Sequence, residues 1–312
     1  DNGIGMCGGN IYAHVKDALE AECILAEVYE DLKDDVEMLL TSVPWQMSKH
    51  LPSGARGPAP LPRKAYGRIE LPEVAMLFDS IHVLAPAGAQ KVEPGDTFPS
   101  MEAIGQNYGF ILYRSGDTSF EAINIAFEEK TLHDRVQVFV DGHDVGDAYR
   151  VDCPTSLSVQ AGTSMDLLVE NMGRTNFGPG IYDYKGLMQK PPVSGSWLAF
   201  SIPLKGDQVQ SLPFRSVSSL SHELLGPVFR RGKFIIAGEP EDTYFDTRGL
   251  DKGVIFINGF NLGRYWDTAG PQHALFVPAP LLKEGENEVI VLELHNASAS
   301  SVLSTAEPRW TD

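Results

Sequence analysis

The sequence has few cysteines and no long apolar run, and both shortages limit what it can encode. Its three cysteines, Cys7, Cys23 and Cys153, form no CxxC pair, so we expect neither a zinc site nor a dense disulfide framework. The histidines are scattered without ligand spacing, and we expect no metal and no other cofactor. No apolar run approaches the roughly 20 residues that a membrane-spanning helix requires. The first residues, DNGIGMCGGN, lack the basic-then-apolar order of a signal peptide. We therefore expect a soluble chain without membrane insertion.

Basic residues are also in short supply. The 312 residues include 42 acidic and 25 basic side chains, for a formal net charge of −17. Such a charge repels phosphate backbones and anionic lipid headgroups. Nucleic acid and membrane surfaces are therefore poor candidates for partners.

The N-terminal part is expected to contain one long amphipathic helix. Between Tyr12 and Leu40, apolar residues recur every three to four positions among good helix formers, and the opposite face is acidic. An isolated amphipathic helix must bury its apolar stripe. We expect the 12–40 helix to dock on a protein partner or on the β domains of its own chain. A stretch rich in Pro, Gly and Ser follows and predicts a linker over residues 44–65.

After residue 65 the sequence consists of short runs rich in β-forming residues. Runs such as FILYRS, VQVFVDG, VIFINGF and NEVIVLEL alternate with Gly, Pro, Asp and Asn. Many strands and few helices predict a mainly β protein built as a sandwich or jelly roll.

Two blocks of this part resemble each other. VQVFVDGHDVG begins at Val136 and VIFINGFNLG begins at Val254. Each is an apolar strand, an Asp-Gly or Asn-Gly turn, and a second strand containing a glycine, which predicts a tight hairpin. Two copies of one β-sandwich topology explain the pair economically. The alternative is that such hairpins arose independently.

These blocks and their neighbours carry a family resemblance. The motifs are QNYGFILYRS, DRVQVFVDGHDVG, MDLLVENMGRTNFG, YDYKGL and KGVIFINGFNLGRYWDTAGPQHALFVP. Together, from about Lys64 to about Leu294, they resemble the C-terminal region of family 35 β-galactosidases. In that family a (β/α)8 barrel carries the catalysis and two β-rich domains follow it. The resemblance implies two jelly-roll, galactose-binding-like β-sandwich domains.

The expected domain organisation combines these observations. An N-terminal segment with the acidic helix covers 1–43, in which Met6 to Asn10 matches the last barrel strand of the family. The expected boundaries then run in order: linker 44–65, first β-sandwich 66–200, second β-sandwich 201–300, and C-terminal tail 301–312.

The catalytic carboxylates of the family are missing from this sequence. Retaining glycosidases need two carboxylates about 5 Å apart across the scissile bond, and neither glutamate motif of the barrel is present. Asp141, Glu170, Asp183 and Asp246 lie in or beside expected strands and turns, where an acid/base pair could form. Turn capping and solvation are the competing explanation.

Two groups of residues are candidates for sugar binding or, alternatively, for a domain interface. Near Phe260 these are Asn261, Arg264, Tyr265 and Trp266, whose aromatic faces could stack on a sugar while the amide and guanidinium bind hydroxyls. In the earlier motif NMGR, Asn171 and Arg174, with Asn176 and Phe177, invite the same two interpretations.

Three functions fit this sequence. The first is a non-catalytic structural or binding module derived from a β-galactosidase and working as a subunit of a larger assembly. The second is the C-terminal portion of an active exo-β-galactosidase whose barrel lies outside these residues. The third is a free-standing carbohydrate-binding module that recognises a galactoside. The compartment follows the function: lysosomal or secreted for an enzyme, intracellular or organellar for a structural subunit.

Overall fold

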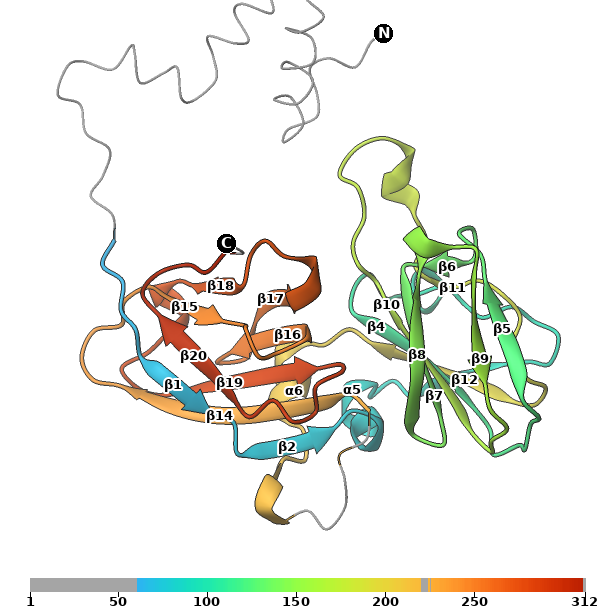
Figure 1. Cartoon of the computed structure of the whole chain (residues 1–312), viewed down its shortest axis with the longest axis horizontal. Helices are drawn as coiled ribbons and strands as arrows, with labels where there is room; N and C mark the ends of the chain where they lie inside the picture. Colours follow the sequence, from blue (N-terminus) through green and yellow to red (C-terminus); the bar gives the residue numbers. More distant parts are fainter. Residues whose placement is uncertain (1–60, 220–223, 225, 311–312) are drawn as a thin grey trace, which may run out of the picture. The chain divides into compact units, whose positions relative to one another are not determined.

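Strands dominate the part of the chain that the computed structural model describes, which is residues 61–219, 224 and 226–310. Twenty strands, β1 to β20, are joined there by short helical turns (Figure 1). The predicted mainly β class is therefore confirmed. The expected 12–40 helix and linker residues 44–60 lie outside the described residues. The helices are α5 (Ile81–Leu84), α6 (Gly206–Gln210) and the 3-10 turns η3 (Phe78–Ser80), η4 (Glu102–Ile104), η5 (Arg150–Asp152), η6 (Pro179–Tyr182), η7 (Val217–Ser219), η8 (Asp267–Ala269) and η9 (Ala279–Leu281).

The first sandwich is built on an antiparallel sheet of six strands. In sheet order these are β3 (Ala89–Val92), β12 (Trp197–Ile202), β4 (Phe110–Ser115), β10 (Met165–Glu170), β7 (Arg135–Val140) and β8 (His143–Tyr149). Its core-facing side packs against a two-stranded sheet of β5 (Ile123–Phe127) and β9 (Thr155–Val159). A short pair, β6 (Leu132–His133) and β11 (Gly186–Leu187), completes it. Trp197 and Tyr113 are fully buried in this core, and each contributes a large apolar surface to it.

The second sandwich repeats the plan with another six-stranded sheet. Its order is β13 (Arg215–Ser216), β2 (Glu73–Met76), β14 (Val228–Ile236), β19 (Gly285–Glu293), β16 (Lys252–Ile257) and β17 (Phe260–Trp266). It faces a four-stranded sheet of β1 (Gly67–Glu70), β20 (Ser301–Thr305), β15 (Thr243–Asp246) and β18 (Ala274–Val277). The apolar core between these sheets contains Phe245, Ile255 and Val291.

The expected domain boundaries need two corrections. Strand β1 pairs with β20 and β2 pairs with β14, so residues 67–76 belong to the second sandwich and not to the first. Residues 301–305 form the central strand between β1 and β15 instead of a tail (Figure 1). Both errors have one cause: strand pairing joins segments that are far apart in the chain, such as Gly67 with Ser304, and local sequence signals carry no information about such pairing.

The two similar sequence blocks form equivalent hairpins, as predicted. Hairpin β7–β8 turns at Asp141 and Gly142, with φ of 50° and 81°, and hairpin β16–β17 turns at Asn258 and Gly259, with φ of 49° and 81°. Positive φ at both central residues is the signature of a type I′ turn. Each hairpin also has a register shift at the same place, next to a glycine in the second strand. The repeat therefore extends from sequence to backbone geometry.

A third apolar layer joins the two sandwiches. It lies between the six-stranded sheets and includes Phe110, Leu112 and Leu168 from the first and Phe229 and Leu292 from the second. The equivalent residues of the two hairpins, Phe139 and Phe256, both belong to it and are almost fully buried. Each large sheet is thus covered on both faces, which makes the two sandwiches one packed body.

Strand β20 provides a direct test of the corrected boundary. Val302 is 2% exposed and its neighbour Leu303 is 37% exposed. We expect Val302→Ala to lower the free energy of unfolding by about 2 kcal/mol, because it leaves a cavity in the second core. Leu303→Ala, on the outer face of the same strand, should cost less than about 1 kcal/mol. Urea denaturation measures both; equal, negligible effects would mean that residues 301–305 do not contribute to the fold.

Candidate functional site: the seam and the arm

Strand β17 is the edge strand along which the two sandwiches meet, and its bulge decides which side chains face the first sandwich. Because the register shifts next to Gly263, three residues share one face: Asn261, Arg264 and Trp266. We call the contact zone along β17 the seam. Tyr265 points the other way, into the second core, where its hydroxyl donates to Leu292 O at 2.7 Å. Burial, reinforced by the neighbouring Glu293 carboxylate, raises the pKa of Tyr265 well above its ordinary value.

Trp266 is engaged by protein groups at the seam. Its ring stacks on Tyr149 of the first sandwich, with centroids 5.4 Å apart and planes 8° from parallel. The Lys252 ammonium lies 4.3 Å from the same ring centroid, within cation–π range. Tyr149 is the residue equivalent to Trp266 in the other hairpin. The ring therefore packs at the contact between the two sandwiches.

A buried ion cluster lies beside this stack. Lys252 Nζ is 3.0 Å from the Glu170 carboxylate, and Arg135 Nη1 is 3.5 Å from it. The three side chains are 3%, 2% and 0% exposed. Burial lowers the pKa of Lys252, and the Glu170 carboxylate opposes that effect. The Lys252–Glu170 pair joins a strand of the first sandwich to a strand of the second. Removing either side chain would leave the other charge buried without its partner.

Direct hydrogen bonds complete the seam. Arg264 Nη2 donates to the carbonyl oxygen of Asn171 at 2.6 Å, which brings together two of the candidate residues predicted from sequence. On the other side, Gln137 Nε2 donates to Leu294 O at 3.2 Å, and Arg135 Nη2 lies 2.8 Å from His295 Nε2.

A loop between β10 and β11, residues 172–184, projects from the first sandwich; we call it the arm (Figure 1). Near the start of the arm, Arg174 forms an ion pair with Glu102 and donates from Nε to Asp183 O at 2.9 Å. Asn171, just before the arm, donates from Nδ2 to Asn107 O at 3.0 Å.

Near the end of the arm, Asp183 is the second anchor point. Its carboxylate accepts from Lys185 Nζ at 2.6 Å and from Arg150 Nη1 at 3.0 Å, and it lies 2.6 Å from His133 Nδ1. Partial burial by itself would raise the pKa of Asp183. Hydrogen bonds from Lys185 and His133 outweigh burial and hold this pKa below its ordinary value. Lys185 is only 1% exposed and also binds Asp134 at 2.7 Å. The arm is thus anchored by ion pairs at both ends.

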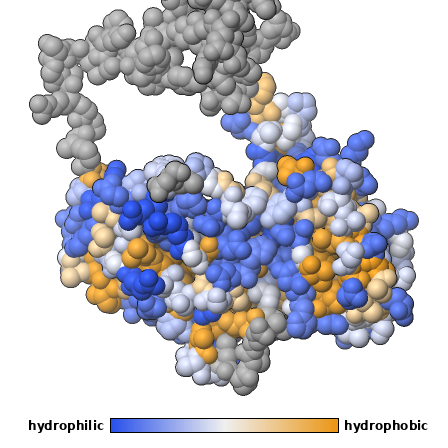
Figure 2. All heavy atoms as spheres, viewed as in Figure 1, coloured by the Kyte–Doolittle hydropathy of each residue, from blue (hydrophilic) through white to orange (hydrophobic). Residues whose placement is uncertain are grey.

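The arm exposes large apolar and aromatic side chains. Phe177 is 57% exposed, Ile181 44%, Tyr182 76% and Tyr184 58%, and apolar atoms are visible on the projecting loop (Figure 2). An exposed apolar and aromatic surface thus lies between two charged anchor points. Sequence reasoning named Arg174 and Phe177 but missed Glu102 and Lys185, whose partners are distant in the chain.

The four carboxylates considered as acid/base candidates are bound in structural contacts. Asp141 accepts hydrogen bonds from Thr163 and Ser164, and Asp246 binds Arg248 with Oδ2 2.6 Å from Nη2. Glu170 and Asp183 belong to the seam and the arm. None of the four lines the cavity near the Asn258 turn or the cavity between the sandwiches.

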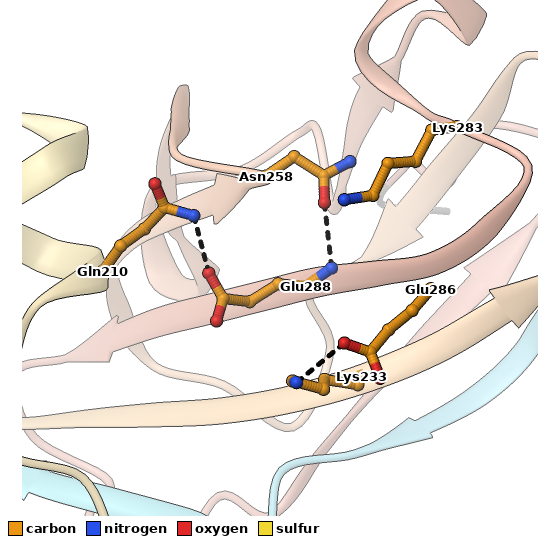
Figure 3. A pocket seen from close by; sticks show the side chains of 6 residues that line it. All are labelled: Gln210, Lys233, Asn258, Lys283, Glu286 and Glu288. Atoms are coloured by element: carbon orange, nitrogen blue, oxygen red, sulfur yellow. Dashed lines mark hydrogen bonds and ion pairs between the residues drawn. The ribbon is translucent and has the colours of Figure 1, made fainter.

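One cavity, of about 200 Å³, lies on the second sandwich near the Asn258 turn (Figure 3). It is lined by Gln210, Lys233, Asn258, Lys283, Glu286 and Glu288. Sequence reasoning missed the two glutamates, which lie two positions apart on β19 and so share a face. Lys233 Nζ is 2.7 Å from Glu286, and Gln210 Nε2 donates to Glu288 at 2.9 Å. None of these lining residues is aromatic.

A second cavity, of about 220 Å³, opens between the sandwiches at one end of the seam. It is lined by Tyr108, Gly109, Phe110, Leu204, Val254, Asn261, Gly263 and Arg264. It therefore contains two of the residues predicted as sugar-binding candidates.

Within the described ranges, no group of three or more His, Cys, Asp and Glu side chains has the geometry to hold a metal ion. Over the same residues, no helix combines the length and apolar character needed to cross a bilayer.

Comparison with known proteins agrees with this architecture. The family "Beta-galactosidase, first all-beta domain" matches residues 99–201, and the family "Beta-galactosidase, galactose-binding domain" matches residues 227–287. Beta-galactosidase 8 of Oryza sativa subsp. japonica is 36% identical over 284 residues, covering 77% of this chain and 42% of that protein. Beta-galactosidase 17 of Arabidopsis thaliana is 38% identical over 266 residues, covering 75% and 37%, and the Homo sapiens Beta-galactosidase is 34% identical over 284 residues, covering 82% and 40%.

The fold and the seam define an all-β region of two sandwiches packed as one body. The chain belongs to the family 35 β-galactosidases, of which it carries the C-terminal all-β region. It spans about two fifths of the length of these curated relatives.

The buried ion pair of the seam predicts a large mutational effect. Lys252→Ala should lower the free energy of unfolding by about 3 kcal/mol, because it leaves the Glu170 carboxylate buried without its ammonium partner. Glu170→Gln combined with Lys252→Ala should cost less than the two separate effects added together, since the two side chains interact directly. Chemical denaturation of the three variants forms the double-mutant cycle.

The matched control is Lys233→Ala, which removes the same residue type from the half-exposed pair with Glu286. It should change the free energy of unfolding by less than about 1 kcal/mol. Equal effects at positions 252 and 233 would contradict a stabilising role for the buried pair.

The lowered pKa of Asp183 predicts a pH-dependent contribution to stability. A carboxyl group whose pKa is lower in the folded state stabilises the fold above its unfolded pKa, near 3.8, and loses that contribution as the pH falls through the folded pKa. Asp183→Asn should therefore cost about 2 kcal/mol near pH 7 and distinctly less near pH 2. Asp117→Asn, at an exposed carboxylate, should have little effect at either pH. An Asp183→Asn effect that does not change with pH would show that the charge is not what matters.

Proposed function

We propose that the two-sandwich unit is the non-catalytic portion of an exo-acting β-galactosidase and braces a (β/α)8 barrel that performs retaining hydrolysis of terminal β-galactosides. The observation that carries this proposal is the match of both sandwiches, in order, to the all-β region of curated β-galactosidases. It is supported by the engagement of Glu170, Asp183 and Asp246 in structural ion pairs. In this role the unit supplies shape and rigidity, and the reacting carboxylates are those of the barrel.

The arm is the element that we assign to contact with the barrel. Aromatic side chains such as Phe177 and Tyr182 are costly to leave in water and are typical anchors of protein contacts. The ion pairs at Arg174 and Asp183 hold the arm in one conformation, which reduces the entropy lost when it docks. A docked arm would fix the position of the first sandwich against the barrel.

A separate protein partner that contacts residues 12–40, where the sequence predicts an amphipathic helix, is a further part of the proposal. An assembly of this kind is compatible with a bracing role.

The proposal assigns catalysis to the barrel and bracing to the two sandwiches, which predicts the outcome of an activity assay. The purified 312-residue chain should not cleave a chromogenic β-galactoside above the blank rate, because neither glutamate motif of the related barrel is present in this sequence. An enzyme-like rate from this chain alone would refute the proposal.

Docking through the arm predicts a surface-specific effect. Tyr182→Ser should weaken association with the barrel portion of the rice relative, expressed separately, by about tenfold, the loss typical of a contact anchor. Ile235→Ser is the matched control, because Ile235 is 67% exposed on the second sandwich, away from the arm. Equal weakening by both variants, or none by Tyr182→Ser, would remove the arm from the proposal. Analytical ultracentrifugation or calorimetry supplies the affinities.

A further inference from the structure

The loop between β19 and β20 contains a tripeptide that neither the seam nor the arm uses. Asn296, Ala297 and Ser298 have the form Asn-x-Ser without a proline in the middle, which is the acceptor sequence for N-linked oligosaccharides. No other asparagine of the chain is followed two positions later by Ser or Thr. Such a tripeptide also arises by chance, so the surroundings of Asn296 decide whether it fits a modification site.

The backbone of this loop is fixed from its inner side. Ala299 is 8% exposed and packs in the second core, and its N–H donates to Asn296 O at 3.0 Å. Arg230 is 4% exposed, and its Nη2 donates to Ala297 O. The loop is therefore held to the sandwich by its backbone and by Ala299, which leaves its polar side chains on the outer side.

The Asn296 side chain contacts the second sandwich and not the seam. Its neighbour His295 lies against the first sandwich, where its Nε2 is 2.8 Å from Arg135 Nη2. Asn296 Nδ2 instead donates to Gly249 O at 3.1 Å. Gly249 has no heavy atom within 4 Å of the point where a Cβ would stand. Space is therefore open beside the amide.

The Asn296 amide has an N–H that its neighbours do not use. An asparagine amide carries two N–H donors. Gly249 O accepts from one, and among the described residues the other has no acceptor. A sugar attached to Nδ2 replaces one N–H and leaves the other to donate to Gly249. The exposed Ser298 donates from Oγ to Asn296 Oδ1 at 2.5 Å, so the backbone brings the amide and the hydroxyl of the acceptor sequence together.

We propose that Asn296 is an N-glycosylation site whose oligosaccharide projects into solvent from the loop between β19 and β20. The donor is an oligosaccharide carried on a lipid pyrophosphate. Asn296 Nδ2 forms a bond to the first sugar carbon, and the bond from that carbon to the pyrophosphate oxygen breaks. The lipid pyrophosphate leaves, and the amide loses one proton to a base.

This modification constrains both the compartment and the partners of the chain. The donor belongs to the secretory compartments, so the chain must pass through them, as expected of an enzyme and not of an intracellular subunit. A bulky glycan keeps this loop in solvent, so a protein partner has to contact another face. The inference does not depend on the proposed function.

The test is glycopeptide mapping of the 312-residue chain, produced in cultured eukaryotic cells behind a cleavable signal sequence and recovered from both medium and cells. We expect one N-linked oligosaccharide at Asn296, and peptide N-glycosidase should lower the intact mass by that of one oligosaccharide. Asn296→Gln and Ser298→Ala should each abolish the modification, and Ser298→Thr should keep it, because threonine supplies the same hydroxyl. Ser300→Ala is the matched control, since Ser300 is exposed in the same loop but lies outside the tripeptide.

Thermal unfolding tests the placement of the glycan. The glycosylated and the enzymatically deglycosylated chain should unfold within about 2 °C of each other, because a glycan in solvent disturbs no packing. An unmodified Asn296 in the wild-type chain would overturn the proposal, as would a glycan that lowers the unfolding midpoint by more than this. If a variant fails to fold, the wild-type glycopeptide still decides the question. A chain glycosylated at Asn296 that does not associate with a barrel would support this site and contradict the bracing role, so the two proposals fail separately.

Discussion

The apolar layer between the two six-stranded sheets is the contact on which the rest of the structure depends. It covers the outer face of each large sheet, so that strands such as β7 and β16 are buried on both sides. Burial of apolar surface at about 25 cal/mol per Å² makes such a layer a dominant stabilising contribution. The seam, its ion cluster and the cavity at its end all exist at the edge of this layer. The packing of the sandwiches is therefore a condition of the candidate sites as well as of stability.

The seam is formed by equivalent positions of two similar hairpins that carry different side chains. Arg135 and Tyr149 of the first copy meet Lys252 and Trp266 of the second, and the Glu170 carboxylate lies between the two cations. Both copies keep the same turn and the same bulge, because those features set which face each side chain occupies. The side chains on that face differ between the two hairpins.

Sequence reasoning predicted the strand-rich class, the two hairpins and the family, because apolar runs, Asp-Gly and Asn-Gly turns and contiguous motifs are local signals. It also selected residues that the fold brings together, as in the bond from Arg264 to Asn171 O. It assigned β1, β2 and β20 to the wrong parts of the chain, since their pairing is long-range. Tyr108 and Glu102 carried no local signal, because their roles come from neighbours far away in the sequence.

The sequence by itself determined that the chain is acidic, rich in strands and built on a repeated hairpin, and that the glutamate motifs of the related enzymes are missing. These properties follow from composition and from patterns a few residues long. Only the tertiary structure decided that the sandwiches share an apolar layer, that Trp266 is stacked on Tyr149, and that Asn261 faces a cavity. The reason is physical: burial and pairing depend on which distant segments meet, and one bulge beside Gly263 sets the face on which three candidate side chains lie.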